Sequence, residues 1–548
     1  MIRSSTLRLA AVCGLVLVAF SARALTLDTQ SLWRDEVDAL CYAYQFPHLV
    51  AAAIAPDPEY RLTTPSACPL ETATAAPGGD AVSRLLATLS RMTRHNGPLY
   101  YFVLRGWVAL AGVSAYAMRF LSLMLGVLCV PLAYATGRRL IGRQAGFLAA
   151  LVMAISPYVV WYGQEVKMYS LVPALALSAV YSLRRACEGG GRRWWAVQIV
   201  STSLAFYCHI FAALLIPVQI LLYLCWWPVS RRCWRGALVS LACLTLPYLP
   251  LVVWQLPSAL RARETGFPAR GLVEMAEILL NGWNLGILPR GWPWGLLLGG
   301  GLAGWGLISP AFVPSSPERG ERRVGPWRTR LAIVCWMVAP LLAIWLISLR
   351  QPLFTDRYLI WSAPAFYLLV VLGLTSIWRL APLRLRGRRL PIGRRVAVVL
   401  LAGTVLVAAV NLYWQAKTTI KSDSRAAAAY VGERIEPGGL IIFQIPHSRY
   451  TFDYYYEGED YEWADGLYTN WLASDGSYLL SQEQAFWSMR AIVFGHDTVW
   501  LVLSEESMWD ERGLVRGWLE DTASLLEEAR FVHVSVHRFQ IPDQPADP

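Results

Sequence analysis

The sequence predicts a polytopic α-helical membrane protein of about eleven transmembrane helices, followed by a small soluble α/β domain. The 548 residues are 55% hydrophobic and 16% charged, with a mean hydropathy of +0.39. This is too apolar for a soluble protein of this length. Residues 416–548 hold 10 basic and 22 acidic side chains, a net of −12, so the total of +11 leaves +23 for residues 1–415. The acidic tail has no run long enough to span a bilayer, which predicts a separate domain.

Eleven apolar runs of spanning length alternate with short polar connectors. They lie near residues 7–27, 117–136, 145–162, 168–186, 194–208, 210–227, 236–256, 292–312, 331–349, 358–378 and 396–414. The first run follows Arg3 and Arg8 and resembles a signal peptide, with a weak cleavage pattern at Ala22-Arg23-Ala24. Because an arginine lies inside that pattern and the run is longer than a typical signal core, we expect it to be retained as the first span.

Arginine-rich connectors fix the direction of the spans. They are residues 138–143, 184–193, 231–235, 319–330 and 379–395. Connectors of this kind face the cytoplasm, which accounts for the basic charge without a nucleic-acid partner. One more crossing at residues 98–113 would invert every later loop, so this segment is expected to be an interfacial helix on the outer face. The first outer loop, residues 28–116, and the C-terminal domain then lie outside.

The acidic tail shows both kinds of secondary-structure signal. Helix signals occur at 425–433 and 514–528, and strand signals at 439–444, 498–504 and 531–539. Their alternation predicts a small α/β domain over residues 416–548, after a membrane domain over residues 1–415.

Two of the ten cysteines, Cys41 and Cys68, share the large outer loop. They either form a disulfide, as an oxidising compartment would allow, or remain two thiols. No Cys-x-x-Cys or His-x-x-x-His spacing indicates a structural metal.

The adjacent carboxylates Asp35 and Glu36 follow the first run by about eight residues. Acidic side chains at a membrane interface are costly and point to a functional site. Further polar motifs stand at the predicted outer ends of the spans. They are His95-Asn96-Gly97-Pro98-Leu99-Tyr100-Tyr101, Arg119, Ser156-Pro157-Tyr158, Gln164-Glu165-Val166-Lys167-Met168-Tyr169, Asp356-Arg357-Tyr358 and Lys421-Ser422-Asp423-Ser424-Arg425.

In their order along the chain and in the side of the membrane predicted for them, these motifs resemble those of the GT-C (C-type) fold glycosyltransferases that use polyprenyl-phosphate sugars. That group holds the protein O-mannosyltransferases and the lipid A aminoarabinose transferases. The likeness covers most of the membrane region. This chain departs from the family at Gly97, where a second proline is common, and at Ser424, where an aromatic residue is usual.

The resemblance implies a division of roles. Asp35 resembles the general base for an acceptor hydroxyl, and Glu36 would position the acceptor or a neighbouring cation. Glu165 resembles the fold's second acidic residue and would orient the sugar or assist the base, or else it pairs with Lys167. The donor phosphate would be bound by Arg357, which can form a bidentate pair, with help from Tyr358. Further candidates for that phosphate are Arg119, His95 and Lys167.

Alternative interpretations of several residues stay open. For Arg119 the alternative to phosphate binding is to anchor a helix end, and for His95 and His209 it is to pack or to cap a helix. No cofactor is required, although Asp35, Glu36 and Glu165 carry the oxygen ligands that a hard divalent cation prefers. A secondary transporter or a non-catalytic membrane scaffold is the alternative to an enzyme.

The predicted function is transfer of a hexosyl or pentosyl group from a polyprenyl monophosphate to a lipid, glycan or protein acceptor. The reaction would take place on the non-cytoplasmic face of a bacterial inner (plasma) membrane, among membrane lipids. The expected partners are the lipid-linked donor and the acceptor, with no nucleic acid.

Overall fold

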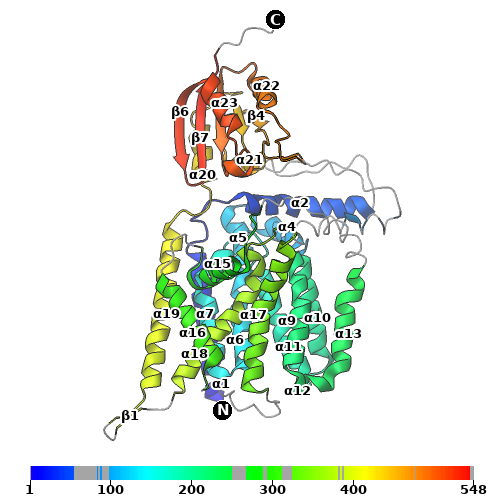
Figure 1. Ribbon diagram of the computed structural model, residues 1–548, viewed down its shortest axis with the longest axis vertical. Coiled ribbons are helices and arrows are strands. Elements are labelled where there is room, and N and C mark those ends of the chain that lie inside the picture. The colour runs from blue at the N-terminus through cyan, green and yellow to red at the C-terminus, as the bar shows by residue number, and fades with distance from the viewer. Residues whose placement is uncertain are drawn as a thin grey trace. The chain divides into compact units, whose positions relative to one another are not determined.

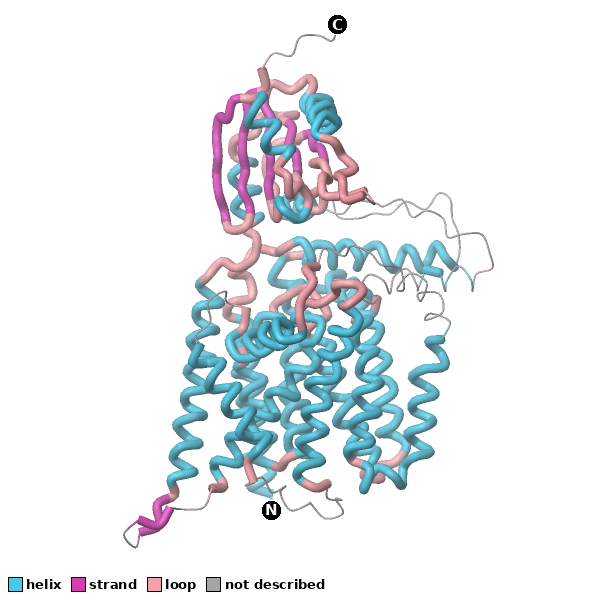
Figure 2. Tube along the Cα trace, in the orientation of Figure 1, coloured by secondary structure: helices cyan, strands magenta, loops and turns pink. Residues whose placement is uncertain are grey.

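The computed structural model describes residues 2–54, 98–249, 267–287, 293–310, 324–380, 383–385, 388–473 and 475–542, with residues 80, 83, 85, 87 and 88. The chain divides into two compact units. The helical unit comprises Met1–Leu27, Phe46–Pro58 and Ala75–Lys417, and the α/β unit comprises Asp28–Gln45, Glu59–Thr74 and Thr418–Pro548. Figures 1 and 2 show a bundle of helices in the first unit and a sheet with helices in the second.

The helical unit is a bundle of apolar helices joined by short connections. The long helices are α1 (Ile2–Ala24), α4 (Leu99–Ala111), α5 (Ala115–Val127), α6 (Cys129–Leu140), α7 (Arg143–Ile155), α9 (Leu171–Cys187), α10 (Arg192–Cys208), α11 (Leu215–Cys225), α13 (Trp234–Thr245), α15 (Leu272–Leu285), α16 (Pro293–Ile308), α17 (Pro326–Ser348), α18 (Ala363–Trp378) and α19 (Ile392–Lys417). Short helical turns are α8 (Pro157–Tyr162), η1 (Ile210–Leu214), α12 (Trp227–Ser230), η2 (Arg231–Cys233), η3 (Leu246–Tyr248) and η4 (Asp356–Ser362). Strands β1 (Leu383–Leu385) and β2 (Arg388–Leu390) form an antiparallel hairpin before α19.

Five helical segments among the described residues are long and apolar enough to cross a membrane. They are Thr6–Ala24, Ala115–Leu140, Pro326–Ser348, Asp356–Trp378 and Ile392–Lys417. Each of the eleven predicted runs contains a helix, but some of these helices are short or broken. The run at 145–162 breaks at Ser156, whose extended backbone ends α7 and whose hydroxyl accepts a hydrogen bond from the Val159 amide at the start of α8. The helices support an integral membrane protein.

The first apolar run packs into the bundle as α1. Arg23, the arginine inside the signal-like pattern, is completely buried and donates hydrogen bonds to the carbonyls of Ala19 and Ala154. A Cβ atom on Gly163 would stand 2.9 Å from the Arg23 Nε, so a glycine is needed where the turn after α8 passes this guanidinium. These contacts favour retention of α1, because cleavage after this segment would remove Arg23 from α7.

The α/β unit holds a mixed five-stranded sheet. The strands are β3 (Leu440–Phe443), β4 (Glu462–Asp465), β5 (Thr498–Leu503), β6 (Ser524–Phe531) and β7 (Val534–Gln540), in the order β4-β3-β5-β7-β6. β3 is parallel to β4 and β5, whereas β7 is antiparallel to β5 and β6. The helices of the unit are α20 (Ser424–Gly432), α21 (Ser448–Tyr455), α22 (Gln482–Val493) and α23 (Leu514–Thr522), with the short η5 (Glu506–Met508).

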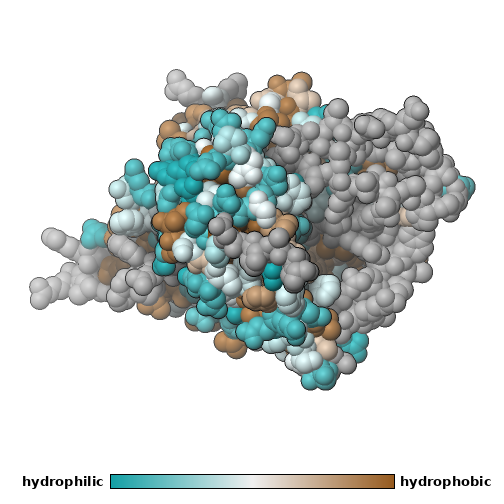
Figure 3. Space-filling view, turned by 90° about the horizontal axis from the view of Figure 1, so that it is seen from above, coloured by the Kyte–Doolittle hydropathy of each residue, from teal (hydrophilic) through white to brown (hydrophobic). Residues whose placement is uncertain are grey.

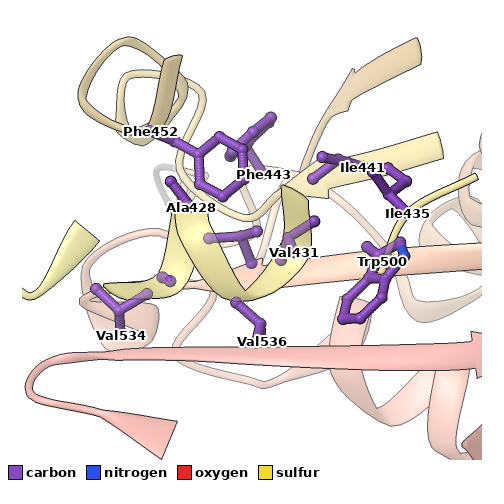
Figure 4. Packing of buried hydrophobic residues seen from close by; sticks show 11 residues of the cluster. Ala428, Val431, Ile435, Ile441, Phe443, Phe452, Trp500, Val534 and Val536 are labelled. Carbon is purple, nitrogen blue, oxygen red and sulfur yellow. The ribbon is translucent and has the colours of Figure 1, made fainter. Parts of the chain in front are cut away.

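Helices cover both faces of this sheet, which is why β3 and β5 read as continuous apolar runs. One core contains Ile441, Phe443, Trp500 and Val502, packed against α20 and Phe452 of α21 (Figure 4). The other contains the alternate residues of the same strands, packed against α22 and α23. That second set is Leu440, Ile442, Val499, Leu501 and Leu503. The surface seen in Figure 3 mixes hydrophilic residues with scattered apolar ones.

One prediction of local structure was wrong. The helix expected at 514–528 ends at Thr522, and residues 524–531 form β6 instead, because Ser524 to Phe531 pair with β7 across a tight hairpin. Within the segment predicted as the first outer loop, the pair Asp35-Glu36 lies in the first turn of helix α2 (Arg34–Ile54). Carboxylates are favoured there, since the N-terminal end of a helix carries a partial positive charge.

Candidate active site

In the helical unit, two tyrosines of α8 hold Asp356. The Tyr162 hydroxyl donates to the Asp356 Oδ2 over 3.0 Å, and the Tyr158 hydroxyl donates to the Asp356 main-chain carbonyl over 3.0 Å. Both rings are buried and meet edge to face, with centroids 4.9 Å apart. Residues 158 and 162 are four apart, so one helical face presents both hydroxyls to the start of η4. This contact fixes the segment that carries Arg357.

Arg357 and Tyr358 lie among aromatic rings. The Arg357 guanidinium lies 5.8 Å from the centre of the Tyr169 ring, a distance typical of a cation–π contact. The Tyr358 ring packs against His209 at 4.8 Å and against Phe211 at 5.4 Å. Both Arg357 and Tyr358 are half-buried, so their positions are defined while part of each side chain stays accessible.

His209 contributes a polar atom to the same cluster. Its side chain is buried, and Nδ1 accepts a hydrogen bond from the Phe211 amide over 3.3 Å. A neutral imidazole whose Nδ1 accepts must carry its proton on Nε2. Nε2 has no hydrogen-bond partner among the described residues. It lies within electrostatic reach of Arg357 and Lys167, so it adds a donor to a basic cluster.

Glu165 and Lys167 lie in the turn between α8 and α9. Both side chains are buried, and the Lys167 ammonium is 5.8 Å from the Tyr101 ring centre. Glu165, Asp356 and Arg357 all lie within electrostatic reach of Tyr162, so the structure brings together charged residues from two distant motifs. The turn itself is anchored where the Ser122 hydroxyl donates to the Lys167 carbonyl and meets the Tyr100 hydroxyl.

Arg119 forms a hydrogen bond to the main chain. Its side chain is buried, and Nη1 donates to the Leu27 carbonyl over 3.0 Å. This bond ties α5 to the chain that follows α1. Arg119 therefore has a structural contact, and its contact with a donor phosphate stays a prediction.

In the α/β unit, the two adjacent carboxylates have different environments. Glu36 is completely buried, and its Oε2 accepts from the Lys421 ammonium over 2.8 Å and from the Trp33 amide over 3.3 Å. Lys421 is buried as well and lies 6.0 Å from the Trp33 ring centre. Asp35 is half-buried. Of the two carboxylates, Asp35 is therefore the more accessible to a reactant.

The Lys421 to Arg425 motif binds the segment that precedes α2. The Gln30 side chain accepts from the amides of Ile420 and Lys421 and donates to the Thr418 carbonyl. Two more contacts follow along the motif: Ser31 donates to Asp423, and Arg425 donates to Asp28. Outside the motif, the Leu32 amide donates to the Tyr455 hydroxyl of α21. A motif whose role the sequence does not reveal thus fixes the position of Asp35 and Glu36.

Two of the predicted residues cannot be located in the structure. His95 and Cys68 lie outside the described residues. Cys41 is disulfide-bonded, and its pairing with Cys68 stays a prediction. Within the described ranges no group of three His, Cys, Asp or Glu side chains is arranged to hold a metal ion.

Three features escaped the sequence reasoning: the tyrosine contacts to Asp356, the Glu36–Lys421 ion pair and the Nε2 donor of His209. The spacing of Tyr158 and Tyr162 could have indicated the first, since residues four apart share a helical face. No local signal could have indicated the second, because residues 36 and 421 are 385 positions apart.

The fold is similar to that of solved proteins of the GT-C class. ArnT from Cupriavidus metallidurans bound to undecaprenyl phosphate aligns over 96% of this chain and 97% of its own, with a TM-score of 0.52 and 14% identity. Its apo form aligns over 98% of both chains, with a TM-score of 0.55 and 14% identity. The archaeal oligosaccharyltransferase AglB from Archaeoglobus fulgidus, in complex with an inhibitory peptide and a dolichol-phosphate, aligns over 97% of this chain and 74% of its own. Its TM-score is 0.52 and its identity 11%.

A model of one protein family matches part of the helical unit. Residues 95–254 match the model described as dolichyl-phosphate-mannose-protein mannosyltransferase. This segment includes Glu165, Lys167 and His209. No curated protein sequence matches the chain. The resemblance predicted from the motifs is confirmed, and the matches support glycosyltransferase activity.

Proposed function

We propose that this protein transfers a sugar from a polyprenyl-monophosphate donor to an acceptor hydroxyl, using Asp35 as the general base. Asp35 takes the hydroxyl proton, the hydroxyl oxygen bonds to the anomeric carbon, and the bond from that carbon to the phosphate oxygen breaks. Polyprenyl phosphate leaves with the bonding electron pair, and the anomeric configuration inverts. The phosphate supplies the leaving group, so no nucleotide site is needed.

The cluster around Arg357 carries this proposal. A departing phosphate needs preorganised positive charge and hydrogen-bond donors. Arg357, Lys167, Tyr358 and the Nε2 of His209 provide both, in surroundings where buried rings strengthen electrostatic interactions. ArnT was solved with undecaprenyl phosphate and AglB with a dolichol-phosphate, so lipid phosphates are ligands of proteins that share this fold.

The two acids proposed for the reaction differ in what supports them. For Asp35, the support is its accessibility beside a neutralised Glu36. In this proposal Glu36 positions Asp35 through its ion pair with Lys421. Glu165 would orient the sugar, a role supported by its buried position near Tyr162 and Arg357. Arg119 and His95 remain proposed as further phosphate contacts.

The topology proposed with this function has eleven spans in residues 1–415, with outer-face interfacial helices. The N-terminus is cytoplasmic, and the domain over residues 416–548 is extracytoplasmic. The arginine-rich connectors and the bonded Cys41 support this orientation, since disulfides persist in oxidising compartments. The bacterial inner membrane and a lipid, glycan or protein acceptor belong to the same proposal.

Membranes carrying single variants test the chemistry. The assay measures transfer from undecaprenyl-phosphate hexoses and pentoses to acceptors in native membranes. Asp35→Asn keeps the shape of the side chain and removes the base, so transfer should fall by about 10²- to 10⁴-fold. Asp475→Asn is the matched control, because Asp475 is an exposed carboxylate of the α/β unit away from these contacts. Unchanged transfer in Asp35→Asn would remove the proposed mechanism.

Donor binding is tested without knowing the sugar. Undecaprenyl phosphate alone should raise the thermal unfolding temperature of the purified wild type. Arg357→Ala should abolish that rise, whereas Arg350→Ala, which changes an exposed arginine at the end of α17, should preserve it. Stabilisation that survives Arg357→Ala would place the phosphate elsewhere.

His209→Phe isolates the Nε2 donor. A phenyl ring keeps the packing on Tyr358 and removes the hydrogen bond. A hydrogen bond to a charged group contributes about 1.5–3 kcal/mol, so undecaprenyl phosphate should bind at least about ten-fold more weakly. Wild-type affinity in this variant would show that His209 is a packing residue.

A further inference from the structure

A cavity of about 330 Å³ lies between α9, α10, α11 and α13 of the helical unit. Most of its wall consists of aliphatic side chains, several of them exposed. They include Ile216, Ile220, Leu224, Leu238, Leu241 and Leu244. Figure 1 shows α13 at the edge of the bundle, beside α10 and α11. A hydrocarbon chain is the ligand that such a wall suits, because no polar group need be desolvated to bind it.

Three polar residues of the wall, Gln198, Gln219 and Ser240, belong to one hydrogen-bond network, and the Tyr223 hydroxyl donates to the Ser230 carbonyl. The Gln198 amide donates to Gln219, whose own amide donates to the Thr202 hydroxyl over 2.8 Å. The Ser240 hydroxyl donates to the Gln198 oxygen over 2.5 Å. This network ties α10, α11 and α13 together behind the cavity. Since its members satisfy each other, the cavity does not require a polar ligand.

One end of the cavity is aromatic, and exposed arginines neighbour its tryptophans in sequence; this end is taken as the opening. Trp195, Trp227 and Trp234 line it at one end, where α10 and α13 begin. The exposed arginines adjacent to these tryptophans in sequence are Arg192, Arg193, Arg231, Arg232 and Arg235. Arg193 and Arg235 lie 5.5 Å from the ring centres of Trp194 and Trp234. Tryptophan and arginine are enriched together at the lipid headgroup level.

This opening is far from the Arg357 cluster. Helix α9 follows Tyr169 of that cluster and reaches the cavity at Leu183, in its last turns. Helix α10 runs from the opening at Arg192 to Cys208, immediately before His209. Each helix has 17 residues, so the two regions lie at opposite ends of elements about 25 Å long.

We propose that this cavity binds an anionic phospholipid of the membrane leaflet at the arginine-rich ends of the helices. One acyl chain fills the aliphatic cavity, and the headgroup phosphate pairs with Arg231 and Arg235. Charge complementarity selects the anionic lipid, because arginines bind phosphate oxygens with charge-assisted hydrogen bonds. The bound lipid fills the space between α13 and the rest of the bundle. This site is independent of sugar transfer.

Native mass spectrometry of the purified full chain tests the proposal. The protein is mixed with equal amounts of dioleoylphosphatidylglycerol, dioleoylphosphatidylcholine and undecaprenyl phosphate. The wild type should retain phosphatidylglycerol in preference to phosphatidylcholine. Because each arginine near an anionic lipid contributes roughly a five-fold factor, the double variant Arg231→Gln/Arg235→Gln should bind phosphatidylglycerol about 25-fold more weakly. Leu241→Trp fills the cavity and should abolish retention.

Matched variants separate the site from general membrane effects. Arg394→Gln removes an exposed arginine at the start of α19 that lies 5.9 Å from the Trp378 ring, and it should keep phosphatidylglycerol. Val239→Trp adds the same bulk as Leu241→Trp on an exposed position of α13 outside the cavity wall, and it should also keep the lipid. Equal retention of both phospholipids by the wild type would overturn the proposal. Loss of undecaprenyl phosphate alone in Leu241→Trp would overturn it too, by assigning the cavity to the polyprenyl tail.

Discussion

Glu36 in the α/β unit and Asp356 in the helical unit are two carboxylates held in contrasting ways. Each stands next in sequence to a residue proposed to act on substrate, Asp35 and Arg357. Glu36 is fully buried and is neutralised by the ammonium of Lys421. Asp356 is half-buried and accepts from the neutral hydroxyl of Tyr162.

The contrast shows that Asp35 and Arg357 have different electrostatic surroundings. An ion pair removes the negative charge beside Asp35, so the accessible acid stands next to a site of no net charge. Hydrogen bonds from tyrosines orient Asp356 without neutralising it, so its charge stays available to hold the Arg357 segment. Loss of a partner should therefore cost more at Glu36 than at Asp356, because only Glu36 would be a fully buried charge that has lost a cation.

The largest effect is expected from Lys421→Met. It leaves Glu36 buried without its cation, which should destabilise the α/β unit by about 3–5 kcal/mol. Hydrogen exchange of the buried strand β5, followed by mass spectrometry over a urea series, measures this change. Arg425→Met is the matched control: its ion pair with Asp28 is largely exposed, and such pairs contribute at most about 1 kcal/mol.

The double variant Lys421→Met/Glu36→Gln sharpens the comparison. It removes both charges, so most of the lost stability should return. Sugar transfer in this variant then separates two roles for Glu36. Transfer near the wild-type level supports positioning, whereas a loss as large as that of Asp35→Asn would make Glu36 a catalytic residue.

The architecture could be predicted from the sequence because it rests on strong local signals. The apolar runs and the basic connectors reflect the cost of placing charge in lipid, which is large for every residue. The strand at Leu440 to Phe443 is similarly clear, because a strand covered on both faces is apolar throughout. The helix ending at Thr522 was mispredicted, because the pairing of β6 with β7 overrode a local helical pattern.

The partners of the candidate residues could not be predicted. Lys421 and Glu36, or Tyr162 and Asp356, meet only through the tertiary fold, and their sequence separations are 385 and 194 residues. The motifs indicated candidate residues, but not which of these residues contact one another. Even the adjacent pair Asp35-Glu36 is divided by burial, a property that two neighbouring acids in a sequence do not reveal.

An effect smaller than that of Lys421→Met is expected from Tyr162→Phe. The variant removes the hydrogen bond to the Asp356 carboxylate, which should cost about 1.5–3 kcal/mol, less than Lys421→Met because Asp356 keeps partial access to water. Thermal unfolding of the purified protein in detergent measures the loss. An effect on the helical unit larger than that of Lys421→Met on the α/β unit would reverse the proposed order of the two carboxylates.

A smaller effect is expected from Tyr158→Phe. Its hydroxyl donates to the main-chain carbonyl of Asp356 rather than to the carboxylate. A neutral hydrogen bond contributes about 0.5–1.5 kcal/mol, so the same thermal measurement should rank this variant below Tyr162→Phe. Equal losses in the two variants would show that the tyrosines act through packing of their rings rather than through the charge of Asp356.

The smallest effect is expected from acid, which acts on the α/β unit through His537. Burial lowers the pKa of the His537 imidazole, on β7. The unfolded chain therefore takes up this proton at a higher pH than the folded unit does, and stability is lost as pH falls through the ordinary histidine value of about 6.5. The loss should not exceed about 1.4 kcal/mol per pH unit, the limit for one proton. Urea unfolding between about pH 7.5 and 5 should lose this slope in His537→Gln and keep it in His496→Gln. A slope that persists in His537→Gln would assign the acid sensitivity to a group other than His537.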